Sequence, residues 1–285
     1  MLNNMLFVVI HTEEISLPGI IFIAIIIVFI IRVNLGSRRT KTFKSGLYRR
    51  SALSDSQTAI LDRYCYYYYN MPTEDLKQIF RKKVAYFINV KKFIPAGGLK
   101  TITEEMKVLI SASATQLAFG YPRVFFMHFN SIVVFPEEFR LHDSNELLDG
   151  KVNLKGAIFL SWKSFVLGYK VPDDGRNLGL HELAHALYFE NAYPNDEYDF
   201  INRRAMFRFV IHTKNEMVKI SEGQHSIFRE YAFKNRHEFF AVAVEYFFER
   251  PFEMKEYNED LYNSLALILN QDTADNKYSL RVISE

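Results

Sequence analysis

Two histidines four residues apart, with a glutamate directly after the first, stand in the segment LHELAHAL at residues 180–187. On a helix, positions i and i+4 share one face and lie one turn apart. Imidazoles in that arrangement can reach one tetrahedral zinc ion at about 2.0 to 2.1 Å. His181 and His185 are therefore candidate metal ligands. Glu182 is the candidate general base, because a carboxylate beside the first ligand can take a proton from water activated by the metal.

The surrounding pattern predicts that this motif lies on a helix. A turn, DDG at residues 173–175, comes first, and leucine and alanine then recur at helical spacing through residue 187. A purely structural helix is the alternative interpretation. It would have to bury three titratable groups on one face without a partner, which is costly.

A catalytic zinc ion of this kind needs a third protein ligand and one position left for water. The extended motif HExxHxxGxxH is excluded, because Tyr188 and Asn191 occupy the required positions. Downstream, residues 235–238 (NRHE) resemble a capping box that opens the helix HEFFAVAVEYFFER. Glu238 and Glu245 lie on one face of that helix, so either could bind the metal while the other orients a histidine. Periodicity does not decide between them.

A closed, structural zinc site is a further alternative. It would need a fourth protein ligand in the place of the water, such as His237 or His212. Cys65 is the only cysteine, which excludes an internal disulfide framework and a cysteine-based zinc knuckle. Any metal must therefore be held by histidine and carboxylate.

The elements that would position these residues predict an α+β fold in which the helices are segregated from one small mixed sheet. Helical patterns begin near Ser54, Pro72 and Thr103, and helices return in the C-terminal half. The tyrosine run at residues 66–69 is interpreted as core packing. Short β-branched and aromatic segments between turn residues predict the strands, at residues 124–129, 131–135 and 157–162.

The N-terminal part of the chain has a different composition. Residues 15–31 carry no charge, and the length of this segment, 17 residues, is at the short end of what crosses a bilayer. Arg32 could lengthen the span by snorkelling. Acidic residues precede this segment, and seven basic residues follow it before Asp55. The positive-inside rule then places the C-terminal bulk in the cytoplasm. A cleaved signal peptide, the alternative, would require the opposite order of charges.

The bulk charge excludes one class of function. A net charge of +2 with 24% charged residues describes an ordinary surface and argues against a dedicated nucleic-acid binder. The aromatic fraction of 15% predicts a core rich in phenylalanine and tyrosine.

The segments LSWKSFVLGYKVPDDGRNLGLHELAHAL and REYAFKNRHEFFAVAVEYFFERP resemble the Mlc titration factor A family of zinc peptidases. The site of that family is similar to the site of the anthrax lethal factor catalytic domain. The segments MPTEDLKQIFRKKVAYFINVKKFIPAGGL and SIVVFPEEF extend the resemblance to about residues 60–273. It implies a zincin-like metallopeptidase domain with one zinc ion, in which Glu238 is the third ligand, Tyr231 stabilises the transition state and Glu245 supports a ligand from behind.

The resemblance also implies a function. The expected activity is hydrolysis of a peptide or protein substrate by a membrane-anchored, cytoplasm-facing zinc metallopeptidase, with the strand at residues 157–162 as an edge that pairs with the substrate. The alternative is a protein that sequesters a transcriptional regulator, with weak or incidental peptidase activity. The expected parts are a short N-terminal segment (1–14), a transmembrane anchor (15–33), a basic juxtamembrane linker (34–53), the zinc peptidase domain (54–275) and a C-terminal tail (276–285).

Overall fold

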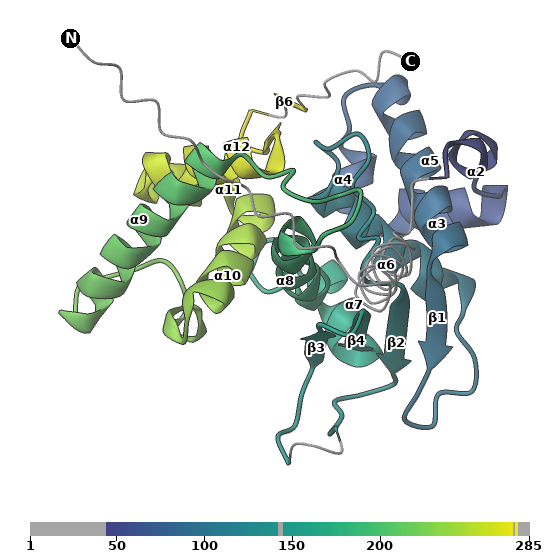
Figure 1. Ribbon diagram of the computed structural model, residues 1–285, viewed down its shortest axis with the longest axis horizontal. Coiled ribbons are helices and arrows are strands. Elements are labelled where there is room, and N and C mark those ends of the chain that lie inside the picture. The colour runs from purple at the N-terminus through teal and green to yellow at the C-terminus, as the bar shows by residue number, and fades with distance from the viewer. Residues whose placement is uncertain (1–43, 142–144, 276, 279–285) are drawn as a thin grey trace, which may run out of the picture. The chain divides into compact units, whose positions relative to one another are not determined.

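A mixed sheet of four short strands is the larger of the two sheets in the described chain (Figure 1). The computed structural model describes residues 44–141, 145–275 and 277–278. The strand order is β1-β2-β4-β3, in which β1, β2 and β4 run parallel and β3 pairs antiparallel with β4 at one edge. The strands are β1 (Lys92–Pro95), β2 (Ser131–Phe135), β3 (Gly150–Asn153) and β4 (Ala157–Ser161). This small mixed sheet among helices confirms the α+β class.

Two details of the predicted sheet were wrong. Residues 124–129 do not form a strand. Phe126 has a φ of 55°, and buried charged side chains form hydrogen bonds with backbone groups that a neighbouring strand would otherwise bind. Lys91 Nζ donates to the carbonyl oxygen of Phe126 at 2.5 Å, and Glu197 accepts from the Phe125 N–H at 2.7 Å. The strand at residues 157–162 is not an edge either, because β4 lies between β2 and β3. The edge strand next to the HELAH helix is β3.

Three helices of the N-terminal half begin at or next to the residues that the sequence indicates, Ser54, Pro72 and Thr103. Ser54, Thr73 and Thr103 each accept a hydrogen bond from the backbone N–H three residues later, which satisfies a free donor of the first turn. The segment 66–69 is core only in part, because Tyr68 is buried while Tyr66 and Tyr69 are exposed. The helices are α2 (Ser45–Arg50), α3 (Asp55–Tyr64), α4 (Tyr66–Tyr69), α5 (Glu74–Val90) and α6 (Glu104–Leu117).

Helices α8 and α10 of the C-terminal half form the centre of the domain. Helix α8 contacts α10 on one side and β3 and β4 on another (Figure 1). Most residues of both helices are buried, which fits their apolar sequences. The elements are α7 (Trp162–Lys170), α8 (Leu178–Ala192), α9 (Arg203–Ser221), the 3₁₀ turn η1 (Glu230–Phe233), α10 (Arg236–Glu249), α11 (Pro251–Tyr257), α12 (Glu259–Leu269) and the pair β5 (Gln271–Asp272) and β6 (Lys277–Tyr278).

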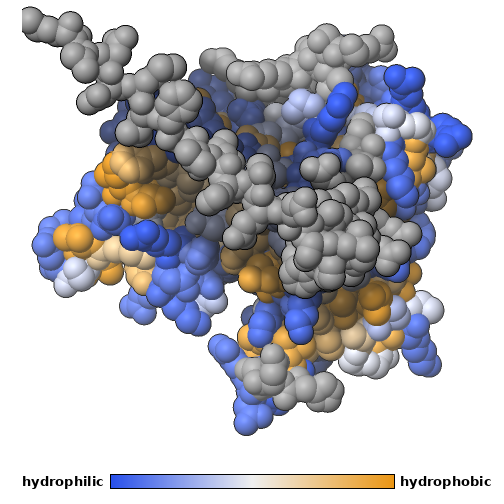
Figure 2. Space-filling view, in the orientation of Figure 1, coloured by the Kyte–Doolittle hydropathy of each residue, from blue (hydrophilic) through white to orange (hydrophobic). Residues whose placement is uncertain are grey.

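Helices α9 and α12 pack against each other and leave apolar side chains at the surface. Figure 2 shows hydrophobic side chains interrupting the hydrophilic surface over these two helices. Phe207, Ile211 and Val218 of α9 and Leu267 of α12 are exposed. The buried faces of the same helices contribute Phe209 and Leu265 to the main core, so the pair is anchored from within.

Several predictions concern residues at the ends of the chain. The predicted anchor at residues 15–33, the N-terminal segment 1–14 and the tail residues 276 and 279–285 lie outside the described residues. Across residues 44–141, 145–275 and 277–278, no helix is long and apolar enough to span a bilayer.

The last part of the predicted linker 34–53, from residue 44 on, packs against the domain. Helix α2 lies beside α5, the Lys44 N–H donates to the Tyr86 hydroxyl at 3.0 Å, and Asn89 donates to the buried Ser51 hydroxyl at 3.0 Å. Packing therefore begins before residue 54.

Candidate metal centre

Helix α8 carries both histidines of the HELAH motif on one face. Asn177 caps the helix by accepting from the Leu180 N–H at 3.0 Å, which fixes where the first turn begins. His181 and His185 follow on successive turns, and their Nε2 atoms lie 3.2 Å apart. Burial lowers the pKa of His185, so that its imidazole is neutral and able to bind a metal at neutral pH.

Helix α10 brings the first of the two candidate glutamates to these nitrogens. Asn235 caps α10 by accepting from the N–H groups of His237 and Glu238, and the Glu238 carboxylate points to α8. Its Oε2 lies 3.1 Å from the Nε2 of His181 and 3.4 Å from the Nε2 of His185. Glu238 is 57 residues after His181 and 53 residues after His185 in the sequence, so only the packing of α10 against α8 brings these side chains together.

The three atoms have the spacing of zinc ligands. Tetrahedral zinc with bonds of about 2.0 to 2.1 Å separates its ligand atoms by about 3.3 to 3.4 Å. The observed separations of 3.1, 3.2 and 3.4 Å are close to the edges of that tetrahedron. The ligand set of two imidazoles and one carboxylate is one that zinc prefers. The residues present therefore fit a zinc ion.

The electrostatics of the centre also favour a cation. Burial alone would lower the pKa of His181, but hydrogen bonds to Glu238 and Glu245 outweigh this effect and raise it to about 10. Burial would raise the pKa of Glu238, yet the two histidines hold it far below the usual value of a carboxyl group. A site that stabilises positive charge on an imidazole in this way would also stabilise a metal ion.

Glu245 lies two helical turns after Glu238 on α10 and contacts the Nδ1 side of the His181 ring. Its Oε1 is 2.6 Å from the Nδ1 of His181, and its Oε2 accepts from the backbone N–H of Asn177 at 2.7 Å. Arg229 donates to both carboxylate oxygens, at 2.6 and 3.1 Å. This arrangement fixes the tautomer of His181 with Nδ1 as donor and directs Nε2 to the metal position. Sequence reasoning assigned no role to Arg229.

We expect the Arg229→Met variant to bind zinc about 10- to 100-fold more weakly, the usual cost of losing a group that orients a metal ligand. Without the guanidinium, the Glu245 carboxylate is buried with less compensating charge and holds His181 less firmly. Titration against a competing chelator measures the change. Arg203→Met is the matched control, because the one ion pair of Arg203 among the described residues is with Asp199 at the surface. Equal zinc affinities for the two variants would contradict the role of Arg229.

Glu182 projects from α8 on the side facing the sheet edge. The carboxylate is buried, its Oε2 has no hydrogen-bond partner among the described residues, and burial raises its pKa to about 7. A buried, unsatisfied carboxylate oxygen is costly unless water or substrate completes it. Gly150 of β3 lies directly against this side chain: a Cβ at position 150 would meet the Glu182 Cγ at 2.5 Å and Oε1 at 2.6 Å. Glycine at position 150 therefore makes room for the carboxylate.

We expect Gly150→Ala to lower kcat about 100-fold, the size of effect that a 1 Å displacement of a catalytic group produces. The added methyl group must push the Glu182 carboxylate aside, while the three candidate ligand atoms stay in place. Zinc content should therefore match the unsubstituted protein, as measured by mass spectrometry.

The matched control is Gly46→Ala, because a Cβ at that helical position meets nothing within 4 Å. If Gly150→Ala retained full turnover, Gly150 would have no role in placing Glu182.

Tyr231 lies in the 3₁₀ turn before α10, with its ring 5.9 Å from the ring of His181. Burial and the negative charge of Glu238 raise the pKa of Tyr231 to about 12, so the phenol keeps its proton at neutral pH. With 47% of its surface exposed, the side chain is accessible from solvent. A protonated phenol beside the ligands is a hydrogen-bond donor to developing negative charge.

The two histidines considered for a closed site are placed differently. In the part of the chain that the structure describes, the only cluster of potential ligands consists of His181, His185 and Glu238, whose ligand atoms lie within 4.8 Å of one another. His237 stacks on Phe189 with ring centroids 5.4 Å apart, and His212 lies on α9. Neither supplies a fourth ligand to this cluster.

Comparison with known proteins identifies the family. Residues 37–269 match the profile of the family described as "glucose-regulated metallo-peptidase M90". The chain is also similar to an uncharacterized protein, slr2042, of Synechocystis sp. (strain ATCC 27184 / PCC 6803 / Kazusa), with 25% identity over 241 residues that cover 77% of this chain and 84% of that protein. The match extends over most of the chain and includes the histidine motif and α10. The protein therefore belongs to the M90 metallopeptidase family, the Mlc titration factor A family that its motifs resemble.

Proposed function

We propose that this protein is a zinc-dependent peptidase that uses Glu182 as its general base. The observation that carries the proposal is the convergence of three ligand atoms beside a buried carboxylate oxygen that has no partner among the described residues. Membership of a metallopeptidase family agrees with this reaction class. His181, His185 and Glu238 would hold the ion, and when bound, zinc would supply Lewis acidity that makes a water molecule nucleophilic near neutral pH.

The chain's own residues would carry the proton and stabilise the charge. Glu182 accepts the proton of the attacking water and later passes it to the leaving amine, for which a pKa near 7 is well matched. Tyr231 donates a hydrogen bond to the developing oxyanion. Glu245, held by Arg229, keeps His181 in one orientation throughout.

Strand β3 is suited to bind the substrate in an extended form. It is the outermost strand of the described sheet next to α8, and its Gly150 touches the Glu182 side chain. A peptide added alongside β3 would pass the general base, with main-chain hydrogen bonds holding it in place. Methylating one backbone nitrogen of a good peptide substrate should then lower kcat/KM. If no position along the peptide is sensitive to methylation, strand addition is excluded.

Chelator-sensitive cleavage of peptides tests the activity. The full chain, loaded with zinc, should cleave members of a mixed peptide library, lose that activity with a chelator and regain it when zinc is restored. A zinc-loaded protein that cleaves no peptide but still binds a protein regulator would instead support the sequestering function. Mass spectrometry of the products also separates cleavage from an end from internal cleavage.

We further propose that the protein is anchored in a membrane by residues 15–33, with the peptidase domain in the cytoplasm. The support is the sequence: an uncharged apolar segment, acidic residues before it and basic residues after it. The full chain should remain in the membrane fraction after a carbonate wash, whereas a variant lacking residues 1–33 should not. Recovery of the full chain in the wash would refute the anchor.

A further inference from the structure

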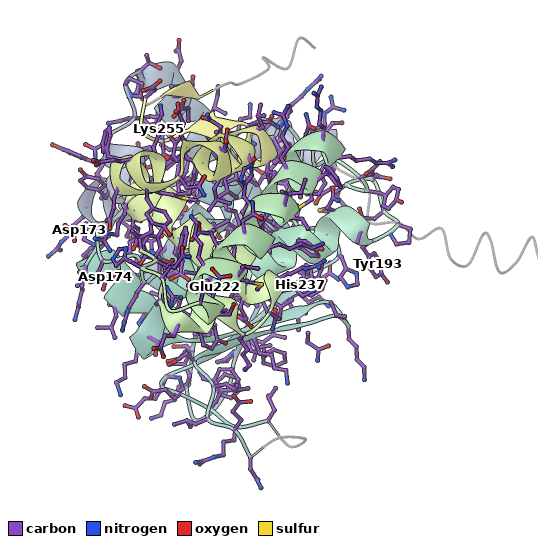
Figure 3. The ribbon with its side chains drawn as sticks, turned by 90° about the vertical axis from the view of Figure 1, so that its left-hand side faces the viewer. Asp173, Asp174, Tyr193, Glu222, His237 and Lys255 are labelled. Carbon is purple, nitrogen blue, oxygen red and sulfur yellow. The ribbon has the colours of Figure 1, made fainter. Side chains whose placement is uncertain are left out.

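A cavity of about 650 Å³ lies outside the candidate metal centre. Helices α4, α7, α10 and α11 and the turn before α8 all contribute to its walls, whereas none of the three candidate metal ligands does. Asp173 of that turn is well separated from His237, the neighbour of Glu238, in Figure 3. The cavity is large enough for a small organic molecule.

Aromatic side chains make up much of the cavity wall. Tyr66 and Phe252 remain 67% and 69% exposed, so their rings are accessible to a ligand. The faces of aromatic rings carry a negative potential that attracts cations, and their apolar surface also binds methyl or methylene groups. The aromatic residues of the wall are Tyr64, Tyr66, Tyr67, Tyr169, Phe248 and Phe252.

The charged residues of the wall are all acidic. Glu249 and Asp173 line the cavity, and no lysine, arginine or histidine belongs to its lining in the described chain. Glu249 is fixed by neutral donors: Asn177 Nδ2 donates to its Oε1 at 3.0 Å, and the backbone N–H of Arg176 donates to its Oε2 at 3.1 Å. Burial raises the pKa of Glu249 to about 7, and the negative charges of Glu245 and Asp174 add to this effect. Among the described residues, no lysine, arginine or histidine forms an ion pair with Glu249.

We propose that this cavity is a binding site for a small organic ammonium ion, held by the Glu249 carboxylate and the aromatic faces around it. A positive charge would compensate the desolvated carboxylate, and the carbon substituents of the ion would cover the rings. An anion would be repelled by both acidic residues. A bare metal ion would find only two carboxylates among apolar walls, fewer oxygen ligands than hard cations need.

Isothermal titration of the zinc-loaded full chain with matched probes tests the proposal. The probes are choline, the bulkier tetraethylammonium ion, and 3,3-dimethylbutan-1-ol, the uncharged carbon isostere of choline. We expect at least one of the two cations to bind, and the isostere to bind about tenfold more weakly than choline or not at all. Equal binding of choline and its isostere would show an apolar pocket without cation selectivity. Absence of binding by both cations would also overturn the proposal.

Substitutions assign the binding to this cavity. Glu249→Gln should weaken cation binding about tenfold or more, because the amide keeps the shape but loses the charge. Glu256→Gln is the matched control: it removes the same charge from an exposed position of α11 outside the lining. If both variants bound the cation as the unsubstituted protein does, the site would lie elsewhere.

A weaker affinity of Glu249→Gln must be distinguished from a loss of structure, and a second pair of variants does this. Glu249 contacts Asn177, whose N–H supports Glu245 behind His181, so zinc content and circular dichroism must be measured for Glu249→Gln. Tyr66→Leu and Phe252→Leu change only exposed rim positions and remove an aromatic face each. Both should weaken cation binding several-fold while zinc content and the circular dichroism spectrum stay unchanged. Retained cation affinity in both would contradict the aromatic contribution.

Discussion

Peptide hydrolysis by the Glu182→Gln variant is expected to fall about 10²- to 10⁴-fold in kcat, the usual contribution of a general base. Glutamine keeps the size of the side chain but cannot take a proton from water. The ligand atoms of His181, His185 and Glu238 are not altered, so zinc content should remain at one ion per chain. Steady-state kinetics and metal analysis on the same sample separate loss of chemistry from loss of metal.

The matched control for this variant is Glu222→Gln, which makes the same change at the exposed C-terminal end of α9 and outside the cluster of potential metal ligands. It should keep full activity. A fully active Glu182→Gln protein would remove Glu182 from the mechanism, although the metal centre itself would stand.

Replacing His185 with alanine is expected to abolish both zinc binding and peptidase activity. The variant keeps only two of the three converging ligand atoms, and zinc affinity should fall by at least about 100-fold, more than for loss of a supporting group. Zinc at 100 times its dissociation constant stabilises a native protein by about 2.7 kcal/mol, so the unsubstituted chain should melt at a higher temperature when zinc is added. The variant should lose that shift.

His212→Ala is the matched control, because His212 lies on α9 and does not belong to the cluster of potential ligands. It should retain the zinc-dependent rise in melting temperature. Were the His185→Ala protein to keep stoichiometric zinc and the same rise, His185 would not be a ligand, and the proposed zinc centre would fail with it.

The pairing of His181 with His185 was predictable because it is local. Four residues are one helical turn, and the turn at residues 173–175 and the apolar spacing after it predict the helix without reference to the rest of the chain. Helix starts near Ser54, Pro72 and Thr103 were predictable for the same reason, since the N-cap bonds of Ser54, Thr73 and Thr103 each span three residues.

The different roles of Glu238 and Glu245 could not be predicted from the local sequence. Both lie on one face of α10, and only the packing of α10 against α8 directs Glu238 to the two Nε2 atoms and Glu245 to the Nδ1 atom of His181. The family resemblance suggested the same division of roles, but periodicity did not. Arg229 gave no sequence signal either, because its partner is 16 residues away and an arginine is usually a surface residue.

Sequence alone determined the histidine pair, the adjacent carboxylate and the helices that carry them, because each depends on contacts within one or two turns. Tertiary structure decided which glutamate faces which nitrogen, why position 150 is glycine, and why residues 124–129 form a loop held by Lys91 and Glu197. These features depend on groups far apart in the chain that meet only after the helices and the sheet have packed. Buried charge and close packing of that kind leave no periodic pattern in the sequence.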